Sequence, residues 1–382
     1  MQRVTPPLSG ERFNVVYRFS GNREEAQAKA WDACIEQTVE FPFDLLPDGD
    51  IPEKIIGQIE SMHPADEDQS SYITRISFAV ENAGHDLVQL LNVIFGNTSI
   101  KPGVRVEKFE LPDSMINRFR GPRFGREGLR TLLGAPDRPL LCTALKPMGL
   151  SVQDLANQAY QFALGGIDII KDDHGLADQV FSPFEERVQR CAEAVSRANQ
   201  QTGYRSFYMP SLGLRADQLL EKAHFAKQNG VGGLMVPPGL VGFDSMRMLA
   251  DDDHLNLPVM LHPAFVGSYV TAPTNGFSHY ALFGQVARLA GADATIYPNW
   301  GGRFSFSKQE CISIVAGSQD PMGNLKTIFP TPGGGMTFDR LPEMLEVYGK
   351  DVIFLMGGGL HRIANTLVES SRTIREMVEK IR

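Results

Sequence analysis

Residues 165–175 read GGIDIIKDDHG, and an apolar run within this stretch ends in four ionisable side chains. These side chains are Lys171, Asp172, Asp173 and His174. Successive side chains of a strand point to opposite faces, so Lys171 and Asp173 share one face while Asp172 points to the other. Because burying unpaired charge is costly, the pattern predicts a strand that carries polar groups to the rim of a sheet or barrel.

The sequence from residue 138 onward is regular. Short runs rich in apolar or β-branched residues alternate with amphipathic segments, most of them long enough for a helix. There are eight such runs: PLLCTAL (139–145), IDIIKDD (167–173), SFYMP (206–210), GLMVP (233–237), PVMLH (258–262), ATIYP (294–298), LKTIFP (325–330) and DVIFLM (351–356). Eight strand–helix units predict a (β/α)8 TIM barrel over residues 138–382. A doubly wound open sheet is the alternative.

Residues 1–137 have a mixed order of elements and predict a separate α+β domain. Strands are predicted for FNVVYRFS (13–20), YITRISFAVENA (72–83) and VRVEKFELP (104–112). Helices are predicted for REEAQAKAWDACIEQT (23–38) and DLVQLLNVIFGN (86–97). A stretch rich in Gly, Pro and Arg then connects this domain to the barrel.

The composition limits the kinds of partner. A formal net charge of −8 over 382 residues argues against nucleic acid or an anionic membrane surface, but not against a small anionic substrate. The four cysteines are far apart and form no CxxC pair, which is typical of reduced thiols and gives no zinc motif. No apolar stretch has the length of a signal peptide core or a membrane span. We therefore expect a cytoplasmic protein.

Polar residues gather at the predicted ends of the strands, where a barrel enzyme carries its catalytic groups. Lys146 follows the first run, and a lysine there could act as a base or simply be solvated. His262 ends the fifth run and could be catalytic or a core histidine. After the second run, Asp173 and His174 offer ligands that suit Mg²⁺ or Mn²⁺. The alternative is a rim ion pair between Lys171 and Asp173, with His174 facing solvent.

Two glycine triplets follow the seventh and eighth runs. Consecutive glycines allow backbone N–H groups to approach an anion, and in this fold these two loops commonly bind phosphate. The alternative is a pair of tight turns without a ligand. The triplets are Gly333, Gly334 and Gly335, and Gly357, Gly358 and Gly359.

These motifs, in this order, resemble the RuBisCO large-chain family, and more closely its RuBisCO-like proteins (form IV). The resemblance covers nearly the whole chain and rests on CIEQT, FGN, FRGPRFG, RPLLCTALKPMGLS, GGIDIIKDD, GGGM and MGGG. It implies a ferredoxin-like α+β domain, a C-terminal barrel and a phosphorylated sugar-like substrate. It also implies a head-to-tail homodimer, or a higher oligomer built from it, in which Glu36 reaches the active site of the neighbouring subunit. Asn97 is similar to the family's active-site asparagine.

The resemblance also implies roles for residues of the barrel. Lys171 is similar to the lysine that CO₂ carbamylates to make a Mg²⁺ ligand, and Asp173 is similar to an aspartate ligand. Lys146 is similar to the family's proton-handling lysine. Arg303 falls near the place of the mobile-loop lysine.

Several positions depart from the family's pattern. His174 stands where a glutamate ligand is usual, which makes a bound cation a stronger Lewis acid, weakens its binding and leaves the carbamylation of Lys171 open. The KPMG motif lacks the carboxylases' second lysine. Pro263 and Ile296 stand where an arginine and a histidine help to hold the second phosphate. We therefore expect one bound phosphate and no true carboxylase activity.

The remaining apparatus polarises a carbonyl and forms or protonates an enolate. Three reactions use it: ketose phosphate isomerisation, diketo phosphate enolisation and β-keto acid decarboxylation. His174 makes us prefer decarboxylation of a sugar acid phosphate of the 3-oxo-isoapionate 4-phosphate type. The first alternative is an isomerase or enolase of methionine salvage, acting on 5-methylthioribulose 1-phosphate or a diketo phosphate. The second is a non-catalytic scaffold or stress protein.

Overall fold

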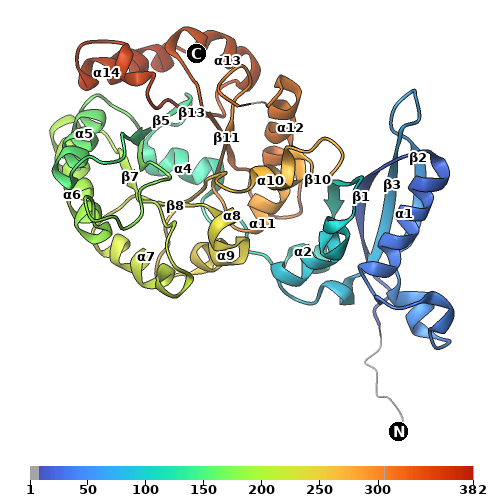
Figure 1. The fold of residues 1–382 in the computed structure, drawn as a ribbon. Helices are drawn as coiled ribbons and strands as arrows, with labels where there is room; N and C mark the ends of the chain where they lie inside the picture. Colours follow the sequence, from blue (N-terminus) through green and yellow to red (C-terminus); the bar gives the residue numbers. More distant parts are fainter. Residues whose placement is uncertain (1–7, 305, 382) are drawn as a thin grey trace. The chain divides into compact units, whose positions relative to one another are not determined.

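The computed structural model describes residues 8–304 and 306–381, which form two compact units (Figure 1). The first unit contains the described residues up to 119 together with 267–285 and 321–324. The second unit contains the rest of the described chain. The domain boundary after residue 137 stays a prediction.

The first unit is a ferredoxin-like sheet with helices, as predicted. Its elements follow the order β-α-β-β-α-β, and the strands lie in the order β10-β4-β1-β3-β2. A capping box between Asn22 and Glu25 starts the first helix. The elements are β1 (Arg12–Ser20), α1 (Arg23–Glu36), β2 (Gln58–Pro64), β3 (Ser71–Ala79), α2 (Leu87–Phe95), β4 (Val104–Glu110), α3 (Asp113–Ile116), α10 (Gly267–Val270) and β10 (Gly276–Phe277).

The second unit contains the eight predicted strands in a closed ring. They are β5 (Leu140–Leu145), β6 (Ile169–Asp172), β7 (Phe207–Met209), β8 (Leu234–Val236), β9 (Val259–Leu261), β11 (Ala294–Pro298), β12 (Phe329–Gly333) and β13 (Ile353–Leu355). Parallel pairing gives β13-β5-β6-β7 and β8-β9-β11-β12. A parallel bridge between Ser211 and Met235 joins these two sets, and β12 lies beside β13. The fold is therefore the predicted barrel rather than an open sheet, although β12 begins later than the run 325–330.

Helices cover the outside of this ring (Figure 1). Those of the second unit are α4 (Gly125–Leu133), α5 (Val152–Leu164), α6 (Phe184–Thr202), α7 (Leu219–Gln228), α8 (Pro238–Val241), α9 (Phe243–Asp251), α11 (Ala287–Leu289), α12 (Lys308–Gln319), α13 (Leu341–Tyr348) and α14 (Leu367–Glu379). No helix among the described residues is both long and apolar enough to cross a membrane. All four cysteines are buried free thiols.

Helix α4 is the exception to this outer layer, because it closes one end of the barrel. Its Leu129 and Leu133 pack into the same buried cluster as Leu140 and Ile353, the first residues of β5 and β13. Figure 1 shows α4 across the ring of strands. The end where the strands begin is therefore filled, and the end where they finish is left for a site.

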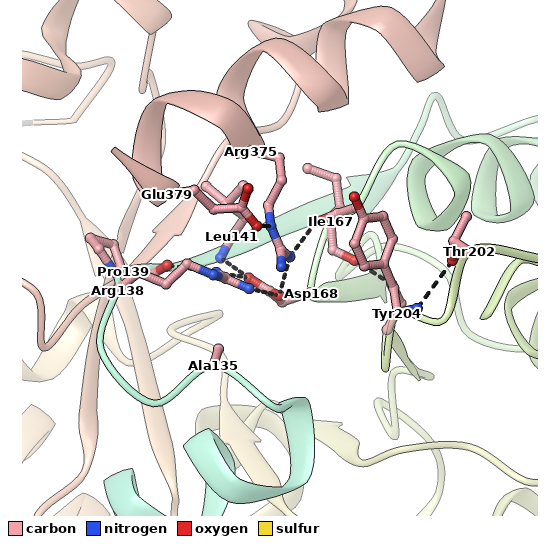
Figure 2. A network of polar contacts seen from close by, with 12 residues as sticks. Ala135, Arg138, Pro139, Leu141, Ile167, Asp168, Thr202, Tyr204, Arg375 and Glu379 are labelled. Atoms are coloured by element: carbon pink, nitrogen blue, oxygen red, sulfur yellow. Dashed lines mark hydrogen bonds and ion pairs between the residues drawn. The ribbon is translucent and has the colours of Figure 1, made fainter. Parts of the chain in front are cut away.

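A buried ion-pair network secures the filled end (Figure 2). Asp168, just before β6, accepts hydrogen bonds from Arg138 at 2.6 and 2.8 Å and from Arg375 of α14 at 3.0 Å. The N–H of Leu141 donates to the same carboxylate at 2.8 Å. One carboxylate thus ties the starts of two strands to the last helix.

Candidate active site

Strand β6 sends alternate side chains into the barrel. Ile169 belongs to the buried cluster inside the ring, and Lys171 lies two residues further along the strand. Lys171 and then Asp173 therefore follow Ile169 on the inward face, while Asp172 points outward. This places Lys171 and Asp173 toward the open end, as the sequence predicts.

Two other strands bring their terminal residues to the same place. Cys142 of β5 belongs to the inner cluster, and Lys146 follows it four residues later. Met260 of β9 also belongs to the cluster, and His262 follows it two residues later. The alternation of side chains thus turns both residues toward the open end.

Asp173 is the centre of this cluster. Its Oδ1 accepts a hydrogen bond from Lys146 Nζ at 2.8 Å and lies 3.5 Å from Nδ1 of His174. Burial alone raises the pKa of Asp173, but the hydrogen bonds from His174 and Lys146 outweigh it and hold the pKa well below its usual range. The ion pair at the rim therefore joins Asp173 to Lys146 rather than to Lys171, and His174 is about half exposed.

The rings of His174 and His262 stack, with centroids 4.8 Å apart and planes inclined by 13°. The N–H of Ala264 donates to Nδ1 of His262 at 3.1 Å, so the neutral ring carries its proton on Nε2. Burial lowers the pKa of His262 well below its usual value, and the electrostatic influence of the Lys171 amine lowers it further. His262 is therefore a neutral donor beside Asp173.

Lys171 is almost completely buried. Only 2% of the residue is exposed, and Nζ donates to the carbonyl of Asp172 at 3.0 Å. Burial lowers the pKa of Lys171, and the charge of Lys146 adds to this effect. A larger fraction of the amine is therefore neutral, which is the nucleophilic form that reacts with CO₂.

Both glycine triplets present unused N–H groups. Gly333 ends β12, and Gly334 and Gly335 follow it with positive φ angles of 74° and 121°. Among the described residues, no acceptor receives a hydrogen bond from the N–H groups of Gly334, Gly335, Gly358 and Gly359. Such groups are suited to an anion, and the binding of phosphate by the triplets stays a prediction.

The two triplets lie together and close to Lys146. A side chain at Gly359 would come within 2.7 Å of the carbonyl oxygen of Met336, so only glycine permits this approach. A side chain at Gly357 would lie 3.8 Å from Cε of Lys146. The loop after β11 joins the group, because the N–H of Arg303 donates to the carbonyl of Gly334 at 3.1 Å. The Arg303 side chain is exposed.

Glu36 and Asn97 belong to the first unit and contact each other. Asn97 Nδ2 donates to Glu36 Oε1 at 3.0 Å, and Lys101 Nζ donates to the other carboxylate oxygen at 3.0 Å. The hydrogen bonds of Asn97 and Lys101 lower the pKa of Glu36. The role of Glu36 in a neighbouring subunit's site and the active-site role of Asn97 both stay predictions.

Residues 126–381 match the profile of one family, described as ribulose bisphosphate carboxylase large chain, catalytic domain. The chain belongs to the RuBisCO large-chain family. This RuBisCO-like protein is 37% identical to the 5-methylthioribulose-1-phosphate isomerase of Rhodospirillum rubrum, over 94% of each chain. It is 32% identical to a 2,3-diketo-5-methylthiopentyl-1-phosphate enolase of Geobacillus thermodenitrificans, over 80% of this chain and 75% of that enzyme. A crystal structure of a RuBisCO-like protein from Rhodopseudomonas palustris has a TM-score of 0.87 and 36% identity, over 96% and 97% of the two chains.

The donor set of this RuBisCO-like protein fits a divalent cation if Lys171 contributes. Asp173 supplies an ionised carboxylate and His174 an imidazole, the donor types that Mg²⁺ and Mn²⁺ accept. Among the described residues, no group of three His, Cys, Asp or Glu side chains is placed to hold a metal. A carbamate on Lys171 would complete the set with a further oxygen ligand.

The sequence interpretation missed a residue that supports this site. Arg187, in the first turn of α6, is fully buried and binds the carboxylate of Asp172. The outward direction of Asp172 was predictable from strand alternation, and it signals a buried partner. The identity of that partner depends on the course of the loop between β6 and α6, which carries no periodic pattern.

Proposed function

We propose that this RuBisCO-like protein is a metal-dependent isomerase of a methylthio-ketose phosphate, of the 5-methylthioribulose 1-phosphate type. The observation that carries the proposal is the placement of Lys146, which lies between the carboxylate of Asp173 and the glycine triplet at Gly357. The similarity to the R. rubrum isomerase, over 94% of both chains, supports this substrate. The preference for decarboxylation rests on His174 alone, and the named relatives support the isomerase or enolase alternative better.

Isomerisation of a ketose phosphate removes a proton from the carbon beside the carbonyl, which gives an enediolate, and then adds a proton to the former carbonyl carbon. The hydroxyl on the first carbon loses its own proton and becomes the new carbonyl, while the old carbonyl oxygen gains one. Lys146 is the candidate for this transfer, because its amine is partly exposed at the open end of the barrel. His262 is neutral with its proton on Nε2, so it can donate a hydrogen bond to a substrate oxygen without adding charge. A Mg²⁺ or Mn²⁺ held by Asp173, His174 and carbamylated Lys171 would polarise the carbonyl and lower the barrier to proton removal.

The substrate's phosphate fits the paired glycine triplets, which offer unused N–H groups among the described residues and whose Gly357 lies close to Lys146. Among the residues that the structure describes, nothing comparable supports a second phosphate. Ile296 packs into the barrel core, and Pro263 has no donor in its side chain. We therefore propose a substrate with one phosphate and an uncharged group at its other end. We expect no carboxylase activity on a bisphosphate.

The test is to incubate the protein with 5-methylthioribulose 1-phosphate and Mg²⁺ in D₂O and to follow the ¹H and ³¹P NMR spectra. We expect deuterium to enter a carbon beside the carbonyl and a new phosphate resonance to appear. Parallel samples contain 2,3-diketo-5-methylthiopentyl 1-phosphate and a β-keto sugar acid phosphate labelled at its carboxylate. Turnover of the diketone alone would favour the enolase, and release of labelled CO₂ alone would favour the decarboxylase. No turnover in any sample and no Mn²⁺ binding would favour the non-catalytic alternative.

The proposal includes a homodimer whose sites are shared. Glu36, the last residue of α1, supports it, since it resembles the glutamate that the family contributes to a neighbouring subunit's active site. Glu36 also accepts a hydrogen bond from Asn97, which resembles the family's active-site asparagine. Inactive Asn97→Ala and Lys171→Met variants should regain activity when they are refolded together, because one mixed site is then intact. No recovery in a mixture shown by mass spectrometry to contain mixed dimers would contradict shared sites.

A further inference from the structure

The carboxylate of Asp172 points away from the candidate active site into a buried pocket of hydrogen-bond donors. Tyr208 donates its hydroxyl to Oδ1 at 2.8 Å, and the N–H of Ser211 donates to Oδ2 at 3.1 Å. Arg187 Nε donates to Oδ2 at 3.1 Å. Asp172 and Arg187 are both fully buried, so this is an ion pair without solvent screening.

Arg187 also binds the loop that carries the candidate metal ligands. This loop, residues 173–183, runs from β6 to α6. One terminal nitrogen of Arg187 donates to the carbonyl of Ser182 at 2.6 Å and to its hydroxyl at 3.2 Å. The other terminal nitrogen donates to the carbonyl of Ala177 at 2.6 Å. A single planar guanidinium therefore binds Asp172 directly before the loop, Ala177 in its middle and Ser182 near its end.

The loop has further internal bonds, but these do not fasten it to the barrel wall. Gln179 donates to the carbonyl of Gly175 at 2.7 Å, and the N–H of Leu176 donates to the carbonyl of Asp173 at 3.0 Å. They give the loop a compact shape. At its start the loop contacts the barrel through Asp173 with Lys146 and His174 with His262, while its middle and end are held by Arg187.

The buried pair of Asp168 with Arg375 provides a comparison at the other end of the same strand. Arg375 binds the carbonyl of Gly166 and the carboxylate of Asp168, which both precede β6 at the filled end of the barrel. It contacts no residue of the loop 173–183. Two buried arginine–aspartate pairs thus hold β6, and the one at Arg187 also holds the loop.

We propose that Arg187 is a positioning residue of the candidate metal site, which holds the loop 173–183 so that Asp173 and His174 face Lys146 and Lys171. This inference rests on the metal site of the proposed function. Residues that hydrogen-bond to metal ligands orient them, and their loss typically weakens metal affinity by about 10- to 100-fold. Arg187 acts instead on the backbone next to the ligands, and we expect an effect of the same order. Loss of Arg187 should therefore weaken metal binding and loosen the loop 173–183 more than it weakens phosphate binding.

The test compares Arg187→Lys with Arg375→Lys, each of which retains a positive charge opposite its aspartate. Binding of Mn²⁺ alone, followed by electron paramagnetic resonance with bicarbonate present, should weaken about 10- to 100-fold in R187K and stay unchanged in R375K. Hydrogen exchange followed by mass spectrometry should be faster across residues 173–183 in R187K only. In turnover, R187K should lower kcat, while KM stays within about threefold at saturating metal.

A second variant separates positioning from the cost of a buried charge. The double substitution Asp172→Leu with Arg187→Met removes both charges but leaves the carbonyls of Ala177 and Ser182 without their donor. We expect weak Mn²⁺ binding here also. Wild-type affinity in the double variant, or unchanged exchange of the loop in R187K, would overturn the inference while leaving the proposed function standing. An absence of Mn²⁺ binding in the wild-type protein would instead overturn the metal site itself.

Discussion

Lys146 is the side chain on which the proposed proton transfer depends. Lys146→Met should lower kcat by about 10²- to 10⁴-fold, the usual contribution of a general base. Its side chain is 35% exposed, so the ion pair with Asp173 contributes little to stability and the melting temperature should change little. Lys350 is a matched control, because it is 33% exposed and pairs with Asp137 at 3.0 Å. Equal turnover in K146M and K350M would contradict the role of Lys146.

Asp293 gives a testable pH dependence of stability. Burial raises its pKa to about 6, although N–H groups of Gly125, Val259 and Phe124 favour the charged carboxylate. The folded protein therefore holds a proton that the unfolded chain releases between pH 3.8 and about 6. The stabilisation from this proton is complete below pH 3.8 and is lost as the pH rises through about 6.

The measurement is the free energy of unfolding in urea across this pH range. Relative to Asp293→Asn, the wild-type value should fall by up to about 1.4 kcal/mol per pH unit as the pH rises, and then become constant. The exposed Asp339→Asn variant should show the same pH profile as the wild type. Parallel profiles for the wild type and D293N would contradict the assignment.

Strand β6 depends on the buried carboxylate just before it. Asp168→Ala should destabilise the protein by about 3–5 kcal/mol, because the buried guanidinium of Arg138 is left without a counter-charge. Asp137→Ala breaks an ion pair whose carboxylate side chain is 76% exposed and should cost less than about 1 kcal/mol. Urea unfolding of both variants tests this difference. The folded fraction of D168A should have the kcat of the wild type, since Asp168 lies at the filled end of the barrel.

The barrel strands were predictable because each is a short apolar run followed by an amphipathic helix. Strand β2 was missed, since most of its side chains are exposed and it ends in Pro64. Helix α4 was also missed. It lies within a stretch interpreted as a connection. Two of its nine residues are Gly125 and Gly128, and Gly134 follows it, so the helical pattern of Leu129 and Leu133 is weak in the sequence.

The candidate site was predictable only as far as strand periodicity reaches. Alternation predicts that Lys171 and Asp173 share a face, and the structure places both toward the open end. It cannot predict that Lys146 rather than Lys171 pairs with Asp173, because that depends on the register of β5 against β6. The stacking of His174 on His262 joins strands that are not neighbours, and no local pattern encodes it.

Metal binding should raise the free energy of unfolding of the whole protein, because the metal binds the folded state. Mg²⁺ at about 100 times its Kd would raise the free energy of unfolding by about 2.7 kcal/mol. We expect Mg²⁺ with bicarbonate to raise the melting temperature more than Mg²⁺ alone, because a carbamate on Lys171 adds an oxygen ligand. Lys171→Met should lose the bicarbonate increment, and a chelator should remove the whole shift. An equal increment in K171M would show that bicarbonate acts elsewhere.

The short strand β10 has a consequence for how the chain is made. It pairs Gly276 and Phe277 with Arg105 and Val106 of β4, so the sheet of the first unit is completed by residues far along the chain. At about 5–20 residues per second, a ribosome needs roughly 8–32 s to pass from residue 119 to residue 277. During that interval the outer edge of β4 lacks its partner, and unpaired edges are sites of aggregation. The first unit therefore starts to fold early in translation and finishes late. We expect nascent chains that end between residues 119 and 277 to depend most on a chaperone.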